Sequence, residues 1–374
     1  MRLLNLTTTN FRNLAHATLE WSAGVNVIVG DNGEGKTNLL EAISVLTTLY
    51  SFRTRRMHGL VRHGEREFYL AAEIDGAGGR RRLEQTVSIG PPLTRELKVN
   101  GQRTGAAAYL GICPVFAITA AQQLLVTGPP LRRRRFLDRY AFLLAPATLD
   151  EVRQYQRALR QRNAALANNA ADDELAAWEA RLASAAAAVT LRREAAAARL
   201  APAFASSYGA CRGKNFPDVS LRHLTAAWLN LQKSREIVEE SYRKRYNETR
   251  ARDRRVGSTV EGPHRHDVRL DADGRPVRDV LSSGQTKVVA TALLLAAVGT
   301  VEQSRGEPLP VVIDDVDAEL DREVFARLSD ELFGERQLFL SSARPEAVAP
   351  LVASSYTLRM NRGQSSGHAT GTGG

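Results

Sequence analysis

A glycine-rich segment near the N-terminus has the residue types and spacing of a phosphate-binding loop. It reads G-x-x-x-x-G-K-T and consists of Gly30, Asp31, Asn32, Gly33, Glu34, Gly35, Lys36 and Thr37. A strand-like run at 25–29 precedes it and a helix-like run at 38–49 follows, which is the context that a P-loop requires. The glycines let backbone N–H groups point at phosphate oxygens, Lys36 reaches the β- and γ-phosphates, and the Thr37 hydroxyl can ligate Mg²⁺. The segment therefore predicts a site for ATP with Mg²⁺.

Two adjacent acids lie far downstream, at the end of an apolar strand-like run. The run at 311–313 is followed by Asp314 and Asp315. We expect Asp314 to hold the Mg²⁺ shell and Asp315 to orient or deprotonate the attacking water, with Asp317 as an alternative acid. Taken alone, the pair fits a helix N-cap with acids in its first turn equally well.

A third motif precedes a long apolar helical run at 288–301. It reads L-S-x-G-Q, the pattern of an ABC-type signature, and consists of Leu281, Ser282, Ser283, Gly284 and Gln285. A serine at a helix N-terminus suits anion binding, although a serine-capped helix explains this segment alone. Because the P-loop, the signature and the double-acid strand occur together and in that order, we favour an ABC-type ATPase.

Five further motifs give the chain a resemblance to the RecF family of ABC/SMC-type ATPases. They are N-F-R-N-L at 10–14, S-F-R-T at 51–54, G-x-P-x-x-R-R-x-F-L-D at 128–138, Q-R-N at 161–163 and G-P-H-R-H-D at 262–267. The resemblance implies an ATP-dependent DNA-binding recombination mediator of gap repair and replication restart, with RecR and RecO as partners and RecA as the recombinase to be loaded. We add Arg12 and Asn38 to the nucleotide-binding candidates.

The chain departs from the family pattern at three places. Residues 120–123 lack an expected acid, although Gln122 is a candidate for the Q-loop glutamine. His266 replaces the first acid of G-P-H-R-D-D, and a metal site in this H-x-H-D segment is the less favoured interpretation. The strand at 337–340 ends in Ser341 and Ser342 instead of a switch histidine. We therefore expect a weak, DNA-stimulated ATPase that uses ATP as a conformational switch.

The composition agrees with a cytoplasmic, DNA-associated protein. The 374 residues carry a net charge of +10, which favours a polyanionic partner. Residues 112–260 hold 25 Lys and Arg but only 14 Asp and Glu, so nearly all of the excess lies in this segment. The two cysteines, Cys113 and Cys211, have no metal-binding spacing. No uninterrupted apolar run reaches the ~18 residues of a membrane span.

The basic segment reads as an inserted helical arm. Helical spacing predicts helices at 150–167, 172–200 and 221–250, the last with Ile237 and Tyr242 facing inward. The DNA-binding candidates are Arg53, Arg132, Arg133, Arg153, Arg157, Arg160, Arg162, Arg243, Lys244, Arg245, Arg252, Arg254 and Arg255. A solvated helix face is an equally good explanation for Arg153, Arg157 and Arg160.

The expected fold is α/β: an ABC-type P-loop ATPase head with an antiparallel β-subdomain, plus the inserted helical arm or lid. We assign the head to 1–111 and 258–374, the arm to 112–257 and a disordered tail to 363–374. Alternation at 67–107 with turns at Asp75-Gly76 and Asn100-Gly101 predicts the antiparallel strands.

In the ABC arrangement one head's signature caps the nucleotide in another head's P-loop. The resemblance therefore implies an ATP-dependent homodimer that clamps double-stranded and gapped DNA, largely independently of sequence. Two other interpretations stay open. Another SMC-like ATPase of DNA repair or chromosome maintenance shares these motifs, but it would carry a much longer coiled coil between the two halves. A transporter ATPase subunit is less favoured because it would need a membrane-coupling surface and usually a switch histidine.

Overall fold

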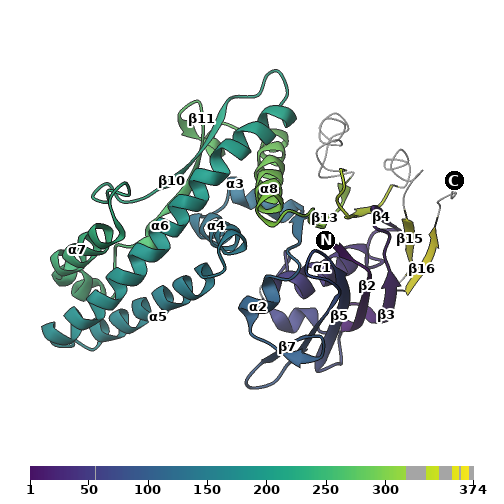
Figure 1. The fold of residues 1–374 in the computed structure, drawn as a ribbon, viewed down its shortest axis with the longest axis horizontal. Helices are drawn as coiled ribbons and strands as arrows, with labels where there is room; N and C mark the ends of the chain where they lie inside the picture. Colours follow the sequence, from purple (N-terminus) through teal and green to yellow (C-terminus); the bar gives the residue numbers. More distant parts are fainter. Residues whose placement is uncertain (55, 317–333, 345–355, 362–363, 370–374) are drawn as a thin grey trace. The chain divides into compact units, whose positions relative to one another are not determined.

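The computed structural model describes residues 1–54, 56–316, 334–344, 356–361 and 364–369. The chain divides into two compact units. Unit 1 consists of Met1–Gln123, Ser207–Lys214 and Ser283–Gly374, and unit 2 consists of Leu124–Ser206 and Asn215–Ser282. Figure 1 labels many of their helices and strands.

Unit 1 contains an antiparallel sheet built from the first hundred residues. Its order is β3-β2-β5-β6-β7-β8, with β1 also paired to β5. The strands are β1 (Arg2–Leu3), β2 (Asn5–Phe11), β3 (Leu14–Glu20), β5 (Glu67–Asp75), β6 (Arg81–Ser88), β7 (Thr94–Val99) and β8 (Gln102–Arg103). The predicted β-subdomain is therefore confirmed, and Asn100 and Gly101, both with positive φ, make the turn between β7 and β8.

A second, largely parallel sheet forms the core of unit 1. Its order is β16-β15-β4-β14-β13-β9. The strands are β4 (Val25–Val29), β9 (Phe116–Ile118), β13 (Val311–Ile313), β14 (Leu338–Ser342), β15 (Tyr356–Asn361) and β16 (Gln364–Ala369). β4, β9, β13, β14 and β15 run parallel, so their carboxyl ends meet at one edge of the sheet. The P-loop after β4 and the acids after β13 lie at that edge.

Helices complete unit 1. They are α1 (Lys36–Thr48), η1 (Met57–Leu60), α2 (Ala106–Leu110), η2 (Ala120–Gln122) and α8 (Ser283–Arg305), with α3 (Gln123–Val126) beginning at the unit's boundary. α1 is buried along most of its length because it contacts β2, β5 and β6 of the first sheet and β13 and β14 of the second. α8 is long and apolar enough to cross a membrane, but 78% of its most apolar window is buried in the protein, as in a core helix.

Unit 2 is a helical body with a small antiparallel sheet (Figure 1). Its elements are α4 (Pro130–Leu144), α5 (Thr148–Ala167), most of α6 (Asp172–Cys211), β10 (Val219–Leu224), α7 (Arg235–Val256), η3 (Pro263–Arg265), β11 (Asp267–Ala272), β12 (Arg275–Pro276) and η4 (Val277–Asp279). Tyr155, Leu182, Val189, Tyr242 and neighbouring alanines form its main core. The small alanine side chains let the helices approach closely.

Three parts of the predicted organisation need correction. Residues 221–250 do not form one helix: β10 pairs with β11, a loop follows, and α7 begins only at Arg235. The alternating burial of β10 is the signature of a strand, and Ile237 is exposed instead of facing inward.

The unit boundaries and the tail also differ from the prediction. β9 pairs with β13 and so belongs to unit 1, whereas β11 and β12 pair with β10 and so belong to unit 2. Part of the tail expected to be disordered forms β16, which pairs with β15. The β9–β13 and β10–β11 pairings join segments far apart in the sequence, so local composition did not indicate them, whereas β15 and β16 form a local hairpin.

Candidate functional site

The P-loop joins β4 to α1 in unit 1. Gly30, Gly33 and Gly35 adopt φ angles of 152°, 90° and 112°, which side chains with a Cβ rarely allow. Lys36 is buried, and its Nζ donates hydrogen bonds to the carbonyl oxygens of Gly30 at 2.7 Å and Asp31 at 3.0 Å. The ammonium group therefore lies inside the loop, where a triphosphate would meet it.

The structure brings together the two residues predicted to hold Mg²⁺. The Thr37 hydroxyl donates to Asp314 Oδ1 at 2.9 Å, and the Ser341 hydroxyl donates to the same oxygen at 2.7 Å. Burial raises the pKa of the Asp314 carboxyl, and the two hydroxyl hydrogen bonds oppose that shift. A hydroxyl and a carboxylate are hard oxygen ligands, so this pair suits Mg²⁺.

Asp315 follows in a left-handed conformation with φ of 50°. Its backbone N–H donates to Ser341 Oγ at 2.8 Å, so one serine contacts both acids. Ser341 stands where a switch histidine was sought in the sequence. Here it orients the acidic turn after β13 instead. Asp317 lies outside the described residues.

A buried carboxylate next to the P-loop was missed by the motif analysis. Glu41 lies on α1 with no exposed surface, and Arg12 holds both of its oxygens at 2.9 Å. Ser51 donates to Glu41 Oε1, and Arg53 forms an ion pair with the carboxylate at 3.6 Å. The sequence did contain a signal for this site, because Glu41 is an acid on an otherwise apolar helix face. A buried carboxylate there requires cations as partners.

The same network reaches the phosphate-binding loop. Arg53 Nη1 donates to Asn38 Oδ1 at 2.7 Å, and Asn38 Nδ2 donates to Asn13 Oδ1 at 2.7 Å. Asn13 in turn is placed to donate to the Glu34 carbonyl oxygen at 3.5 Å. Arg12 and Asn38, both predicted as nucleotide-binding residues, therefore belong to one hydrogen-bonded cluster around the start of α1.

The signature residues surround the start of α8. Ser282 is the last residue of unit 2, and Ser283 begins the helix. Ser282, Ser283 and Gly284 are exposed, whereas Gln285 is half-buried. A Cβ added to Gly284 would meet no atom within 4 Å, so the backbone there is open to close approach. Gln122 ends η2, which contacts α8 within unit 1.

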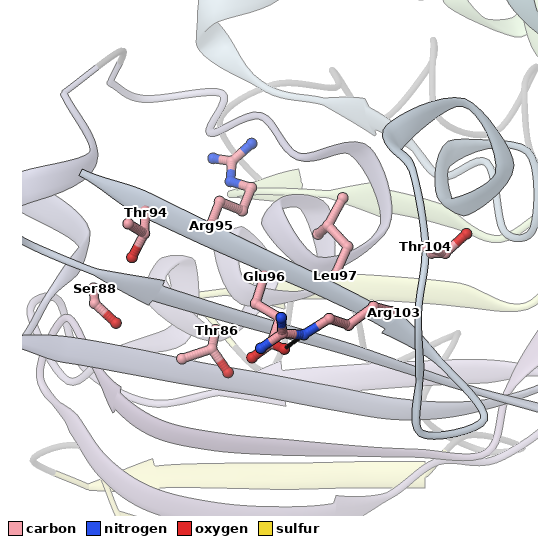
Figure 2. Close-up of a pocket in the computed structure, with 8 residues that line it drawn as sticks. All are labelled: Thr86, Ser88, Thr94, Arg95, Glu96, Leu97, Arg103 and Thr104. Carbon is pink, nitrogen blue, oxygen red and sulfur yellow. Dashed lines mark hydrogen bonds and ion pairs between the residues drawn. The ribbon is translucent and has the colours of Figure 1, made fainter. Parts of the chain in front are cut away.

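A shallow pocket in unit 1 lies away from the sequence motifs. Figure 2 shows its lining on β6, β7 and β8 and the chain that follows: Thr86, Ser88, Thr94, Arg95, Glu96, Leu97, Arg103 and Thr104. Arg103 pairs with Glu96 across it, while the Arg95 guanidinium donates to the Leu49 carbonyl oxygen and Met57 Sδ. None of the predicted site residues lines this pocket.

Within unit 2 the family-like motifs contact one another. Arg133 holds both oxygens of Asp267 at 2.8 and 2.7 Å, so R-R-x-F-L-D binds the last acid of G-P-H-R-H-D. Asp138, from the first motif, accepts two hydrogen bonds from Arg193, which also donates to the Pro263 carbonyl oxygen. These contacts hold α4 to β11 and to α6, and they hold α6 to η3.

The Q-R-N motif on α5 is likewise structural. Arg162 is completely buried and binds Asp253 at 2.7 Å and Glu179 at 3.0 Å. Asn163 Oδ1 accepts hydrogen bonds from both the N–H and the hydroxyl of Thr259. Arg162 therefore joins α5, α6 and α7, and the prediction that it contacts DNA is wrong because a buried side chain cannot reach a phosphate backbone.

Three histidines gather in unit 2 near the G-P-H-R-H-D segment. His264 Nδ1 lies 2.6 Å from the Tyr155 hydroxyl, and His266 packs edge-on against His223. Burial is the main cause that lowers the pKa of His264 to about 4 and that of His266 to about 3; nearby arginines contribute to both shifts, and His223 contributes to that of His266. Among the described residues, no group of three or more His, Cys, Asp or Glu side chains is arranged to hold a metal ion.

Comparison with known proteins identifies the family. A family model described as the RecF/RecN/SMC N terminal domain matches residues 2–366. The DNA replication and repair protein RecF of Anaeromyxobacter sp. (strain Fw109-5) is 37% identical over 321 residues, covering 86% of each chain. The protein of the same name from Acidothermus cellulolyticus is 36% identical over 370 residues, covering 94% of this chain and 96% of the relative.

The chain belongs to the RecF family. A solved structure described as the recombination mediator protein RecF-ATP in the RecFOR pathway matches with a TM-score of 0.89 and 26% identity, over 98% of this chain and 97% of that chain. An SMC head bound to the C-winged helix domain of ScpA shares the fold, with a TM-score of 0.55 and 14% identity. The expected ABC/SMC-type ATPase family and α/β fold are confirmed.

The structure divides the basic residues that were predicted to bind DNA into those that form ion pairs within the protein and those that do not. Arg133 is buried against Asp267, Arg245 binds both oxygens of Glu261, and Arg254 binds Asp172. Exposed, weaker pairs within one helix turn hold Arg153 and Arg243. Among the residues that the structure describes, no ion pair or hydrogen bond engages the side chains of Arg132, Arg157, Arg160, Lys244, Arg252 and Arg255.

Proposed function

We propose that this chain is an ATP-dependent DNA-binding recombination mediator. The observation that supports ATP·Mg²⁺ binding is the contact of Thr37 with Asp314 at 2.9 Å beside a P-loop whose lysine is buried. Lys36 would exchange the carbonyl oxygens of Gly30 and Asp31 for the β- and γ-phosphates. Thr37 and Asp314 would hold Mg²⁺, which supplies charge neutralisation for the phosphates.

Hydrolysis would depend on the turn after β13. Asp315 would orient the attacking water, and Ser341 would keep Asp314 and Asp315 in register through its two hydrogen bonds. We propose that hydrolysis is slow, because the end of β14 presents serines and not a histidine near the γ-phosphate, and that DNA stimulates it. ATP then acts as a switch between two assembly states.

Those states would be monomer and head-to-tail dimer. The signature is exposed at the N-terminus of the 23-residue helix α8, where the first backbone N–H groups and the helix dipole favour an anion. We propose that Ser282 and the Gly284 N–H bind the γ-phosphate held by the P-loop of a second copy. ATP binding would close this symmetric dimer, and hydrolysis would open it.

The closed dimer would bind DNA, both duplex and gapped, mainly through phosphates. Arg157 and Arg160 lie on the outer face of α5, and Lys244 and Arg255 lie exposed on α7. Because these cations have no protein partner in the described chain, they can bind phosphates without breaking an ion pair. By relation to the RecFOR-pathway proteins, RecR and RecO are the proposed partners, and the proposed outcome is loading of the RecA recombinase.

A mixing experiment tests the two-chain site. Lys36→Met should abolish ATP-dependent dimerisation, and Ser282→Arg should block it while leaving ATP binding by the monomer intact. A mixture of the two variants contains one intact composite site, so it should recover partial dimerisation in sedimentation velocity with ATP. Each variant alone and the mixture with ADP are the controls.

Two outcomes would count against the proposal. Dimerisation of Lys36→Met at wild-type protein and ATP concentrations would show that the P-loop does not drive assembly. Unchanged dimerisation of Ser282→Arg, alone and in the mixture, would reduce Ser282 to a helix-capping residue.

A further inference from the structure

The phosphate-binding loop contains a carboxylate that engages one of the loop's own N–H groups. Glu34 Oε2 accepts a hydrogen bond from the backbone N–H of Asp31 at 2.8 Å. A Cβ added to Gly30 would lie 2.5 Å from the same oxygen, so the carboxylate sits over the backbone where the loop leaves β4. Backbone N–H groups of such a loop are the donors that hold phosphate oxygens. Glu34 therefore stands where a ligand phosphate would bind.

The charges of the loop also indicate that Glu34 opposes the binding of a phosphate. Between Gly30 and Thr37 the chain carries two acids, Asp31 and Glu34, and one cation, Lys36. Lys36 Nζ is bonded to the carbonyl oxygens of Gly30 and Asp31, at the same end of the loop as the Glu34 carboxylate. A polyphosphate that enters must take over the Asp31 N–H and draw Lys36 from its carbonyl partners, and it must do so against the charge of Glu34.

We propose that Glu34 sets the nucleotide affinity of the P-loop by competing with a phosphate group for the Asp31 N–H. The inference rests on the proposed function, because it concerns the same ATP site. A phosphate oxygen displaces the Glu34 carboxylate from the Asp31 N–H. The displaced side chain, which is only half-buried before the ligand binds, then moves into solvent. The ligand class is a polyphosphate; the adenosine portion is not affected.

A purely structural role makes the opposite prediction. The spacing of Asp31 and Glu34 is that of a capping box, in which an acid three residues along bonds back to the first backbone N–H. If this bond only shapes the loop, removing it loosens the loop and weakens phosphate binding. If Glu34 is a competitor, removing it strengthens binding. Whether the loss of Glu34 strengthens or weakens phosphate binding therefore distinguishes the two roles.

The experiment measures binding of MgATP, inorganic pyrophosphate and adenosine by titration calorimetry. Glu34→Ala removes both the charge and the acceptor and should tighten MgATP binding by about fivefold, the effect of one nearby charge in water. Glu34→Gln keeps an acceptor oxygen and should tighten it by less. Asp31→Asn is the matched control, because it removes an equal, exposed charge from the same loop and should have the smallest effect.

The pyrophosphate affinity should change by the same factor as the ATP affinity, while adenosine should show no change. Equal or weaker MgATP binding by Glu34→Ala would overturn the proposal, as would an equal gain in Asp31→Asn, since that would be a general charge effect. If the wild-type chain binds neither MgATP nor pyrophosphate, the proposed function fails. If the wild type binds and only the Glu34 variants disagree, the competition alone fails.

Discussion

Two buried carboxylates, one in each unit, use the same kind of partners for different purposes. Glu41 in unit 1 is held by Arg12 at 2.9 Å and Arg53 at 3.6 Å. Glu179 in unit 2 is held by Arg162 at 3.0 Å and Arg250 at 2.7 Å. Both satisfy the rule that a buried charge needs opposite charges and hydrogen bonds around it.

The two networks differ in the exposure of their arginine side chains and in what else these side chains contact. The side chains of Arg12 and Arg53 are 20% and 46% exposed, and Arg53 continues to Asn38 at the P-loop helix. Arg162 has no exposed surface, and its partners come from α6, α7 and Thr259. The first network leaves cations beside the P-loop, the proposed ATP site, whereas the second only joins helices. Burying the cation as well as the acid turns a positioning network into a structural one.

The largest expected effect is on the structural network. Arg162→Ala should destabilise unit 2 by about 3–5 kcal/mol, because it leaves Asp253 and Glu179 as buried charges without their main partner. Urea unfolding followed by circular dichroism measures the loss. Arg160→Ala, on the exposed face of the same helix, is the control and should change stability by less than about 0.5 kcal/mol. Similar stabilities for both variants would contradict the assigned role of Arg162.

In the ligand site, Asp315→Asn should lower the rate of ATP hydrolysis by about 100-fold and leave ATP affinity nearly unchanged. Asparagine tolerates the left-handed backbone of this residue as well as aspartate does, so the turn should be retained. Single-turnover hydrolysis and an ATP titration measure the two quantities. Loss of ATP binding with the rate retained would move the water-orienting role to another acid, such as Asp317.

A crossed pair of substitutions tests the comparison directly. Glu41→Gln should weaken ATP binding roughly tenfold, because Arg12 and Arg53 lose a charged acceptor that positions them. Glu179→Gln should lower the stability of the protein about as much as Glu41→Gln does, but it should leave ATP affinity unchanged. Calorimetric titration with MgATP and thermal unfolding are measured for both. If Glu179→Gln weakens ATP binding equally, the effect is a general loss of folding and Glu41 has no separate role.

DNA binding should distinguish exposed from paired arginines. The double variant Arg157→Ala and Arg160→Ala should weaken duplex binding by about fivefold at moderate salt and reduce the slope of log K against log salt by about 1–2. The matched control is Arg245→Ala, whose guanidinium is already bound to Glu261. Fluorescence anisotropy at several salt concentrations gives both numbers. An equal change of slope in the control would assign DNA contact to the paired arginines as well.

The smallest expected effect is a pH dependence that comes from unit 2. The pKa of His264, about 4, and that of His266, about 3, lie below the ordinary value of 6.5. At a pH between these values and 6.5, the histidines therefore bind protons in the unfolded chain but not in the folded chain. Stability is therefore complete above pH 6.5 and falls as the pH drops toward 4, by about 1 kcal/mol or less per histidine at pH 6. His266→Gln should flatten this decline, whereas His16→Gln, at an exposed residue of unit 1, should not.

The sequence by itself predicted the features that depend on local spacing. The P-loop needs only a strand, a short run of glycines and a helix, so Gly30–Thr37 could be recognised and the structure places it between β4 and α1. Thr37 and Asp314 were each assigned to Mg²⁺ from their own motifs, and the structure places them 2.9 Å apart. The antiparallel strands of unit 1 followed from their alternation and from the Asn100-Gly101 turn.

Only the tertiary structure decided which charges face a ligand. Arg133, Arg162, Arg245 and Arg254 look like their neighbours in sequence, but each meets an acid 16 or more residues away. The strand β10 was read as a helix because its partner, β11, begins more than forty residues later. The partners of Glu41 and Glu34, Arg12 and the Asp31 N–H, became known only from the structure. Spacing along the chain determines local geometry, but the pairing of a charge depends on long-range packing that spacing does not record.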